Sequence, residues 1–213
     1  MEPVCYSTDD TAELAEIFNG NEALIKKYAE KLSISFERVE YAKNNFIRVV
    51  KVMKAFVLND SVKSFLCLNN KLPQENKGLF DIKLLEEFAD AIIKLYGIKG
   101  LKGKDLLYSI NSEDYDAKRA EFIQRLSKGE KLFVISSYNT VGAGQNLQYK
   151  APGNATIVAV NDYDRGDMEK DFDCIYLEKP TNLLVNVDSK KGIEAENLIR
   201  FVYQMEFLME RGE

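Results

Sequence analysis

A short loop between residues 137 and 147 holds the residue types best suited to bind phosphate. It follows a run of strand-forming residues at 132–135, and it contains two glycines and several small polar side chains. Glycine N–H groups and small hydroxyls can bind phosphate oxygens without reading a base sequence. The loop residues that we predict to contact phosphate are Ser137, Thr140, Gly142 and Gly144.

The rest of this loop offers further contacts and a plainer interpretation. Asn146 could hydrogen-bond to a ribose, and the rings of Tyr138 and Tyr149 could stack on a base. Alternatively, Gly142 and Gly144 only form a turn, Asn146 caps the next segment, and the tyrosines pack in an apolar core, as tyrosines more commonly do.

The chain contains no histidine, which excludes several kinds of catalysis. Ser-His-Asp and Cys-His triads and histidine metal sites are ruled out. The three cysteines, Cys5, Cys67 and Cys174, are far apart and odd in number. They predict neither a disulfide framework nor a zinc site, and two of them lie in apolar runs that favour buried free thiols. We therefore assign no catalytic residue and no metal ligand.

Two charged clusters are weaker candidates. Five aspartates between residues 162 and 173 include Asp-x-Asp spacing, which can bind a divalent cation. The calcium-loop pattern fails, because Asp167 and Asp173 stand where it needs Gly and Glu, and this favours a solvated acidic insertion. Lys99, Lys102 and Lys104 could touch phosphates near the same sheet edge, although an exposed loop is the simpler interpretation.

Length, composition and charge limit the possible classes of protein. With 213 residues and 46% hydrophobic content, the chain can form one sizeable core, or a core plus a helical appendage. A net charge of −5 provides no global attraction for nucleic acid, although a local basic stripe would suffice. The sequence has no long apolar stretch and no signal-peptide core, which predicts a soluble, cytoplasmic protein without membrane contact.

The loop is preceded by alternating strands and helices. We expect strands at 62–68, 105–110, 131–136, 155–160 and 172–178, and helices at 81–96, 112–127 and 193–210. Such alternation predicts an α/β fold whose mostly parallel sheet is flanked by helices. The carboxyl ends of its strands would then form the ligand-binding edge.

The region before the first strand has helical periodicity. We expect helices at 11–18, 23–32 and 35–58, the last one capped by Ser33 or Ser35. This predicts an N-terminal helical extension or connector over residues 1–60, followed by an α/β domain over residues 61–213.

The order of elements around the loop has specific residues attached to it. A helix with an Arg and a later Phe leads to a basic-Gly turn, a strand ending in serines, and a loop with Gly-x-Gly and Asn-Leu. These positions are Arg119, Phe122, Lys128–Gly129, Ser136–Ser137, Gly142–Ala143–Gly144 and Asn146–Leu147. In these features the chain resembles the C-terminal RecA-like lobe of superfamily-two helicases and translocases. The last two groups resemble the motif of that family that contacts the nucleic-acid backbone and couples it to the nucleotide cleft.

The resemblance implies an ATP-dependent helicase lobe with a RecA-like (P-loop NTPase-type) sheet, which contacts DNA or RNA. It assigns Gly142, Gly144 and Asn146 to the nucleotide side, and it assigns nucleic-acid contact to Ser137, Tyr138, Thr140 and Gly142. The family's lysine loop and Asp-Glu pair are absent, so ATP and Mg²⁺ would bind only together with an N-terminal RecA-like ATPase lobe.

The family's arginine motif also departs from its pattern here. Arg200, Gln204 and Arg211 are the right residue types at the wrong spacing. Either that motif has degenerated or it lies beyond residue 213, and we expect no ATP hydrolysis by this chain alone.

Two other functions remain open at this point. The first is a non-catalytic α/β protein-interaction module derived from the helicase fold. The second is a small-molecule enzyme on a Rossmann-like sheet with Asp or Lys as its base, which is disfavoured because the first strand lacks the glycine fingerprint.

Overall fold

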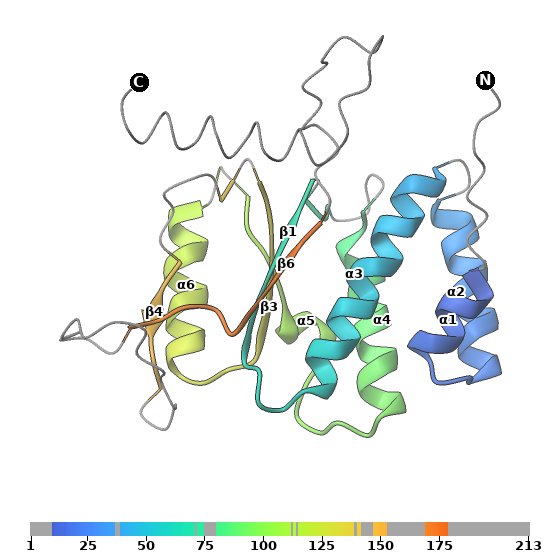
Figure 1. The fold of residues 1–213 in the computed structure, drawn as a ribbon, viewed down its shortest axis with the longest axis horizontal. Helices are drawn as coiled ribbons and strands as arrows, with labels where there is room; N and C mark the ends of the chain where they lie inside the picture. Colours follow the sequence, from blue (N-terminus) through green and yellow to red (C-terminus); the bar gives the residue numbers. More distant parts are fainter. Residues whose placement is uncertain are drawn as a thin grey trace, which may run out of the picture. The chain divides into compact units, whose positions relative to one another are not determined.

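The structure is a computed structural model that describes residues 10–36, 39–70, 72–74, 80–111, 113, 115–138, 140–141, 147–152 and 169–178. These residues form a four-stranded, all-parallel sheet with helices on both faces, and a second sheet of two short strands (Figure 1). The predicted α/β class with a parallel sheet is thereby confirmed. The predicted strand at 155–160 and helix at 193–210 lie outside the described residues.

The main sheet has the strand order β2-β3-β1-β6. Its strands are β1 (Ser64–Asn69), β2 (Leu107–Ser109), β3 (Leu132–Ser137) and β6 (Cys174–Leu177). The two central strands, β1 and β3, are almost entirely buried, as expected for parallel strands covered on both faces. From β1 the chain passes over β3 to β2, which is one edge strand. From β3 it passes over β1 to β6, which is the other edge strand. The connections that leave β1 and β3 therefore run toward opposite edges of the sheet.

Helices cover the sheet in layers (Figure 1). They are α1 (Asp10–Ile17), α2 (Glu22–Ser35), α3 (Glu40–Leu58), α4 (Ile82–Leu95), α5 (Gly103–Leu106) and α6 (Tyr115–Ser127). Helices α3 and α4 lie on one face of the sheet, α6 lies on the other, and α1 and α2 lie outside α3 and α4. The apolar stripe of α4, with Leu85, Phe88 and Ile92 on one side, explains this placement.

The N-terminal helices share one hydrophobic core with the sheet. Phe56 of α3 packs against Phe65 of β1 and Phe133 of β3, with ring centroids 5.5 and 5.7 Å away. Farther out, Tyr28 of α2 lies against Phe88 of α4 at 4.3 Å. Whether residues 1–60 and 61–213 fold as separate domains stays a prediction.

Several boundaries differ from those predicted. Ser33 and Ser35 lie within α2, and α3 begins after Val39 without a side-chain cap, so the predicted serine cap is wrong. The strand predicted from residue 105 starts two residues later, because 103–106 form the short helix α5. The antiparallel pair β4 (Tyr149–Lys150) and β5 (Glu169–Lys170) was not predicted, since two residues are too few to show an alternating pattern.

Candidate functional site

The buried polar residues gather at the carboxyl ends of the strands. Among the described residues they are Asn45, Ser64, Asn69, Ser136, Ser137 and Glu178. Only Ser64 lies at the amino end of its strand. The others lie at the ends of β1 and β3, directly after β6, or on the facing helix α3. Ligands of open α/β sheets commonly bind at this edge, so we take these residues as the candidate site.

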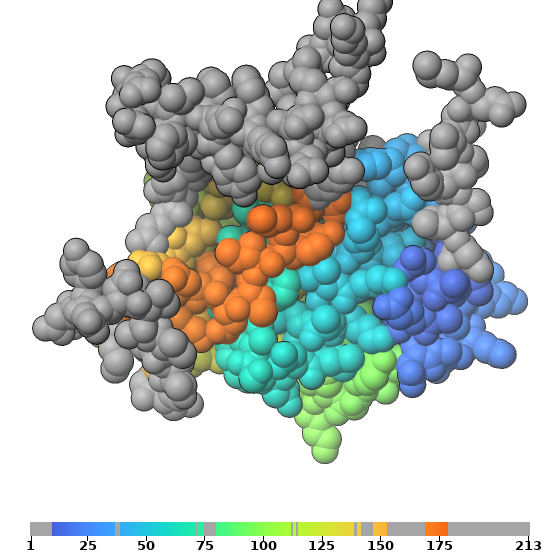
Figure 2. All heavy atoms as spheres, in the orientation of Figure 1, coloured from blue at the N-terminus to red at the C-terminus, as the bar shows by residue number. Residues whose placement is uncertain are grey.

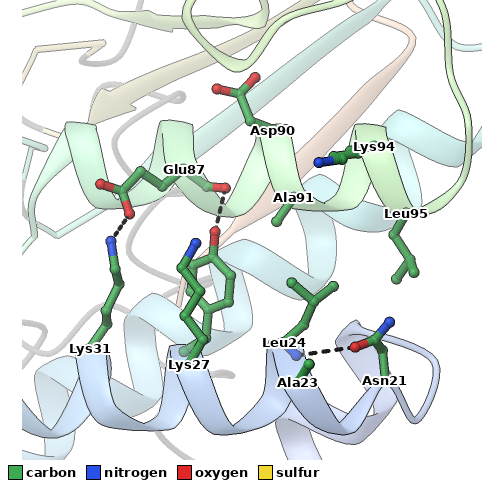
Figure 3. Close-up of a pocket in the computed structure, with 11 residues that line it drawn as sticks. Asn21, Ala23, Leu24, Lys27, Lys31, Glu87, Asp90, Ala91, Lys94 and Leu95 are labelled. Atoms are coloured by element: carbon green, nitrogen blue, oxygen red, sulfur yellow. Dashed lines mark hydrogen bonds and ion pairs between the residues drawn. The ribbon is translucent and has the colours of Figure 1, made fainter.

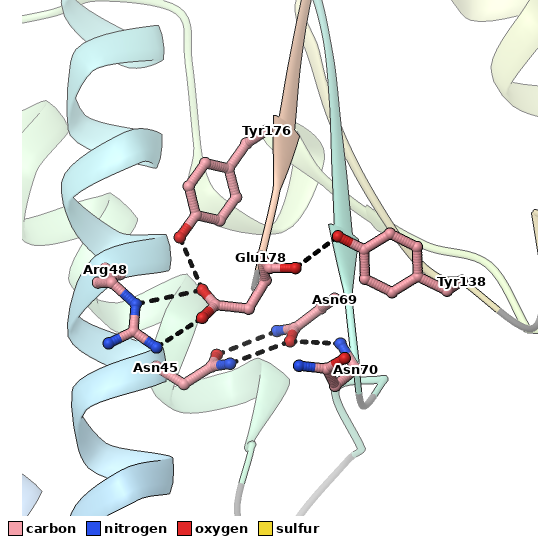
Figure 4. A network of polar contacts seen from close by, with 7 residues as sticks. All are labelled: Asn45, Arg48, Asn69, Asn70, Tyr138, Tyr176 and Glu178. Atoms are coloured by element: carbon pink, nitrogen blue, oxygen red, sulfur yellow. Dashed lines mark hydrogen bonds and ion pairs between the residues drawn. The ribbon is translucent and has the colours of Figure 1, made fainter. Parts of the chain in front are cut away.

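A buried carboxylate forms the centre of the site (Figure 4). The side chain of Glu178 is 1% exposed, and Arg48 of α3 donates to its two oxygens from Nη2 at 2.5 Å and from Nε at 3.3 Å. The hydroxyl of Tyr176 donates to Oε2 at 2.6 Å. The hydrogen bond to Glu178 raises the pKa of Arg48, so the guanidinium stays charged. Its side chain is 44% exposed, so the pair joins a partly exposed cation to a buried carboxylate.

An amide pair next to this carboxylate joins α3 to the end of β1. Asn45 and Asn69 exchange two hydrogen bonds of 3.1 and 3.2 Å. The Oδ1 atom of Asn69 also accepts from the backbone N–H of Asn70 at 2.7 Å. The side chain of Asn69 therefore fixes the end of β1. Asn70, the next residue in the chain, is half-buried.

Tyr138 connects the end of β3 to the end of β6. Its hydroxyl donates to the backbone carbonyl of Glu178, and the N–H of Glu178 donates to the carbonyl of Leu68 at 2.9 Å. Burial and the nearby Glu178 carboxylate raise the pKa of the Tyr138 phenol. Tyr138 is at the predicted edge, where it is half-buried and its hydroxyl is bonded to the protein.

Ser137 and Thr140 form the first turn of the predicted loop. Their hydroxyl oxygens are 2.9 Å apart, and the N–H of Thr140 donates to Oγ of Ser137 at 3.2 Å. Ser137 is buried and Thr140 is half-buried. These hydroxyls therefore shape the start of the loop as well as lining the edge. Gly142, Gly144 and Asn146 lie outside the described residues.

The other sequence candidates lie elsewhere. Tyr149 is 2% exposed and shares a hydrogen bond with Ser64 at the amino end of β1, which confirms apolar packing over base stacking. The lysine cluster is exposed and directly precedes β2, so it lies at the amino edge of the sheet, opposite the predicted one. Asp173 accepts hydrogen bonds from the N–H groups of Lys63 and Ser64, again at the amino edge. Within the described ranges, no group of three acidic or thiol side chains could hold a metal ion.

Sequence reasoning missed Arg48, Glu178, Asn45 and Asn69. A signal existed for two of them, since Asn69 ends an apolar strand, as Ser137 does, and Glu178 directly follows one. Arg48 lies beside buried Ile47 and Val49 in α3, and nothing in that pattern indicates a partner 130 residues away.

Comparison with known protein-family models finds no match, and comparison with curated proteins finds none either. The helicase resemblance therefore rests on the sequence motifs between Arg119 and Leu147. In the part of the chain that the structure describes, no helix has the length and apolar character needed to cross a membrane.

Proposed function

We propose that this chain binds the phosphate backbone of DNA or RNA at the carboxyl edge of its sheet, as the C-terminal lobe of an ATP-dependent helicase or translocase. The observation that carries this proposal is the register of the sheet. It places Asn69 beside Ser137, and Glu178 directly follows the paired end of β6, so the predicted phosphate-binding loop starts at the buried polar cluster.

The chemistry of this edge suits a phosphate ligand. Arg48 is a partly exposed cation held in place by Glu178. Lys118 of α6 reaches the carboxyl end of β2, where its Nζ donates to the carbonyl of Ser109 at 3.0 Å. Both oxygens of the Glu178 carboxylate accept from Arg48, and this pairing offsets the repulsion of an incoming anion by the carboxylate. Such contacts position a nucleic-acid backbone without reading its sequence.

The sequence has no Walker-type lysine loop, and among the described residues no group of three acidic or thiol side chains could hold a metal ion. ATP binding in this proposal therefore depends on an N-terminal RecA-like ATPase lobe, which would contribute the lysine loop and the acidic pair. In such an arrangement this chain would contribute the loop at residues 142–146 to the shared cleft.

Binding of a fluorescein-labelled oligothymidylate, followed by anisotropy, tests the proposal. We expect affinity to fall with added salt. Asn70→Asp adds a negative charge at the carboxyl edge and should weaken binding about tenfold, which is about 1.4 kcal/mol. Gly144→Asp, in the predicted phosphate loop, should also weaken it.

Ser61→Asp is the matched control, because it adds the same charge at an exposed position before β1, at the opposite edge. Equal affinities of Asn70→Asp and Ser61→Asp would contradict binding at the carboxyl edge. Absence of binding by the chain, alone and joined to an ATPase lobe, would contradict the helicase proposal as a whole.

A protein-interaction module is the second candidate function, and one observation favours it. Ile175 and Leu177 of β6 are 59% and 61% exposed. The strand β6 is orange in Figure 2 and runs across the face of the molecule shown there. Exposed apolar side chains that lie close together are typical of protein-binding surfaces. A partner that is retained by the wild-type chain and lost with Ile175→Asp and Leu177→Asp would support this function.

A further inference from the structure

A groove between α2 and α4 forms a second site, which shares no residue with the carboxyl edge. Its volume is about 780 Å³ (Figure 3). Along α2 the lining residues Leu24, Lys27 and Lys31 follow helical spacing, so they share one side of that helix. From Asn21 to Lys31 the lining runs about 15 Å along the helix axis, or nearly three helical turns.

The floor of the groove is fixed by Tyr28. This side chain is 2% exposed, its ring centroid is 4.3 Å from that of Phe88, and its hydroxyl donates to the backbone carbonyl of Glu87 at 2.9 Å. A buried ring and a hydrogen bond across the groove keep α2 and α4 at a constant separation. The site is therefore preformed, which lowers the entropic cost of binding.

The charges in the groove are unevenly paired. Glu87 forms an ion pair with Lys31, and Asp90 accepts a hydrogen bond from the N–H of Gly103 at 2.7 Å. Both carboxylates are thus engaged. Lys27 and Lys94 are exposed and form no ion pair with any residue that the structure describes, although Lys27 lies 5.3 Å from the ring centroid of Tyr28. Two cations from opposite helices consequently line the groove without a carboxylate partner.

Aliphatic side chains lie toward one end of the groove. They are Leu24 of α2 and Leu95 of α4, and Asn21 lies next to them (Figure 3). An anionic ligand with aliphatic side chains would complement both parts of the groove. A nucleic-acid backbone would complement only the lysines.

We propose that this groove binds an acidic, leucine-containing peptide segment of a partner protein. A carboxylate of the peptide lies between Lys27 and Lys94, and an aliphatic side chain packs against Leu24 and Leu95. Both lysines are exposed, so salt screens their ion pairs with the peptide, and we expect binding to be weak and to fall with added salt.

The test measures anisotropy of a fluorescein-labelled peptide, Leu-Glu-Glu-Leu-Leu-Glu-Glu-Leu, with the full chain. Lys27→Glu/Lys94→Glu should weaken binding at least about tenfold. Lys26→Glu/Lys83→Glu is the matched control, because it makes the same charge change on exposed residues of the same two helices outside the groove. A peptide with Gln in place of Glu should bind the wild-type chain about as weakly as the Glu-containing peptide binds the Lys27→Glu/Lys94→Glu variant.

Three results would overturn the proposal. The first is no binding of the peptide at submillimolar concentration, and the second is equal loss of binding in both double variants. The third is a loss of oligothymidylate binding in the Lys27/Lys94 variant with peptide binding unchanged, which would identify the groove as a nucleic-acid contact. None of these results depends on the carboxyl-edge variants, so the two proposals can fail separately.

Discussion

At the scale of single residues, the pair formed by Arg48 and Glu178 links α3 to the carboxyl end of β6. It joins residues 130 positions apart, which is why sequence reasoning could place Ser137 at the edge but not this pair. Ser137 follows a recognisable strand, so its position is local information. The partner of Arg48 depends on how α3 packs over β1 and β6, and no local pattern records that.

The first prediction concerns this pair. Arg48→Ala should lower the free energy of unfolding by about 2–3 kcal/mol, because it leaves the Glu178 carboxylate buried without its cation. The value is below the range for fully buried pairs, since the arginine is 44% exposed. Urea unfolding followed by circular dichroism measures it. Arg48→Lys should recover part of the loss, and an unchanged midpoint in Arg48→Ala would show that the pair contributes little.

A second residue, Asp173, gives a prediction of pH dependence. Burial alone would raise the pKa of Asp173, but its ion pair with Lys170 and the N–H groups of Ser64 and Lys63 outweigh burial, so the pKa lies below its ordinary value of 3.8. The stabilisation by the carboxylate is therefore fully present above that value, and it is lost as pH falls through the lower, folded-state pKa.

Asp173→Asn should thus lower the free energy of unfolding by about 1–3 kcal/mol at pH 7. The difference from wild type should shrink as the pH falls below about 4. Urea titrations at several pH values measure this difference. A gap that stays constant over this range would show that the charge of Asp173 is unimportant.

At the scale of elements, a long and regular apolar pattern is sufficient to predict a helix or strand, whereas a weak local preference is not. The predicted helix at 81–96 agrees with α4, and the strand at 131–136 agrees closely with β3, because each has a long, regular apolar pattern. The start of β2 was misplaced, since the short helix α5 depends on a tertiary contact. The Cβ of any other residue at Gly103 would lie 2.5 Å from the backbone carbonyl oxygen of Glu86 in α4.

Gly103→Ala should therefore force α5 away from α4, and we expect a loss of about 1–3 kcal/mol in the free energy of unfolding. Lys104→Ala, an exposed change in the same helical turn, should stay within about 0.5 kcal/mol of wild type. Thermal and urea unfolding of both variants compare them. Equal stability of the two would mean that α5 can shift without cost.

At the scale of the whole molecule, the N-terminal helices and the sheet belong to one continuous core. Apolar contacts run from Phe18 through Tyr28 and Phe88 to Phe46, and then through other α3 residues to the phenylalanines of β1 and β3. Helical periodicity in the sequence predicted α1 to α3 as elements. It could not tell whether they form an appendage or a layer, because that depends on which residues face the sheet.

The last prediction tests this continuity. Phe46 is fully buried, with the rings of Phe36, Phe80 and Phe88 within 5.5 Å of its own, so Phe46→Ala should lower the free energy of unfolding by about 3–5 kcal/mol. The loss should extend to the sheet. Burial raises the pKa of the Cys67 thiol in β1, so this thiol should react with a disulfide reagent only after β1 unfolds.

In a Cys5→Ser/Cys174→Ser background, circular dichroism and Cys67 labelling should therefore report the same urea midpoint, and Phe46→Ala should shift both together. Ile34→Ala is the control, because this side chain is 80% exposed and its removal should change neither midpoint. If Phe46→Ala lowered only the helical signal and left Cys67 protected to the wild-type urea concentration, residues 1–60 would unfold as a separate domain. A shared shift would instead make α3 part of the α/β unit, and the link from Arg48 to Glu178 would then act within one cooperative fold.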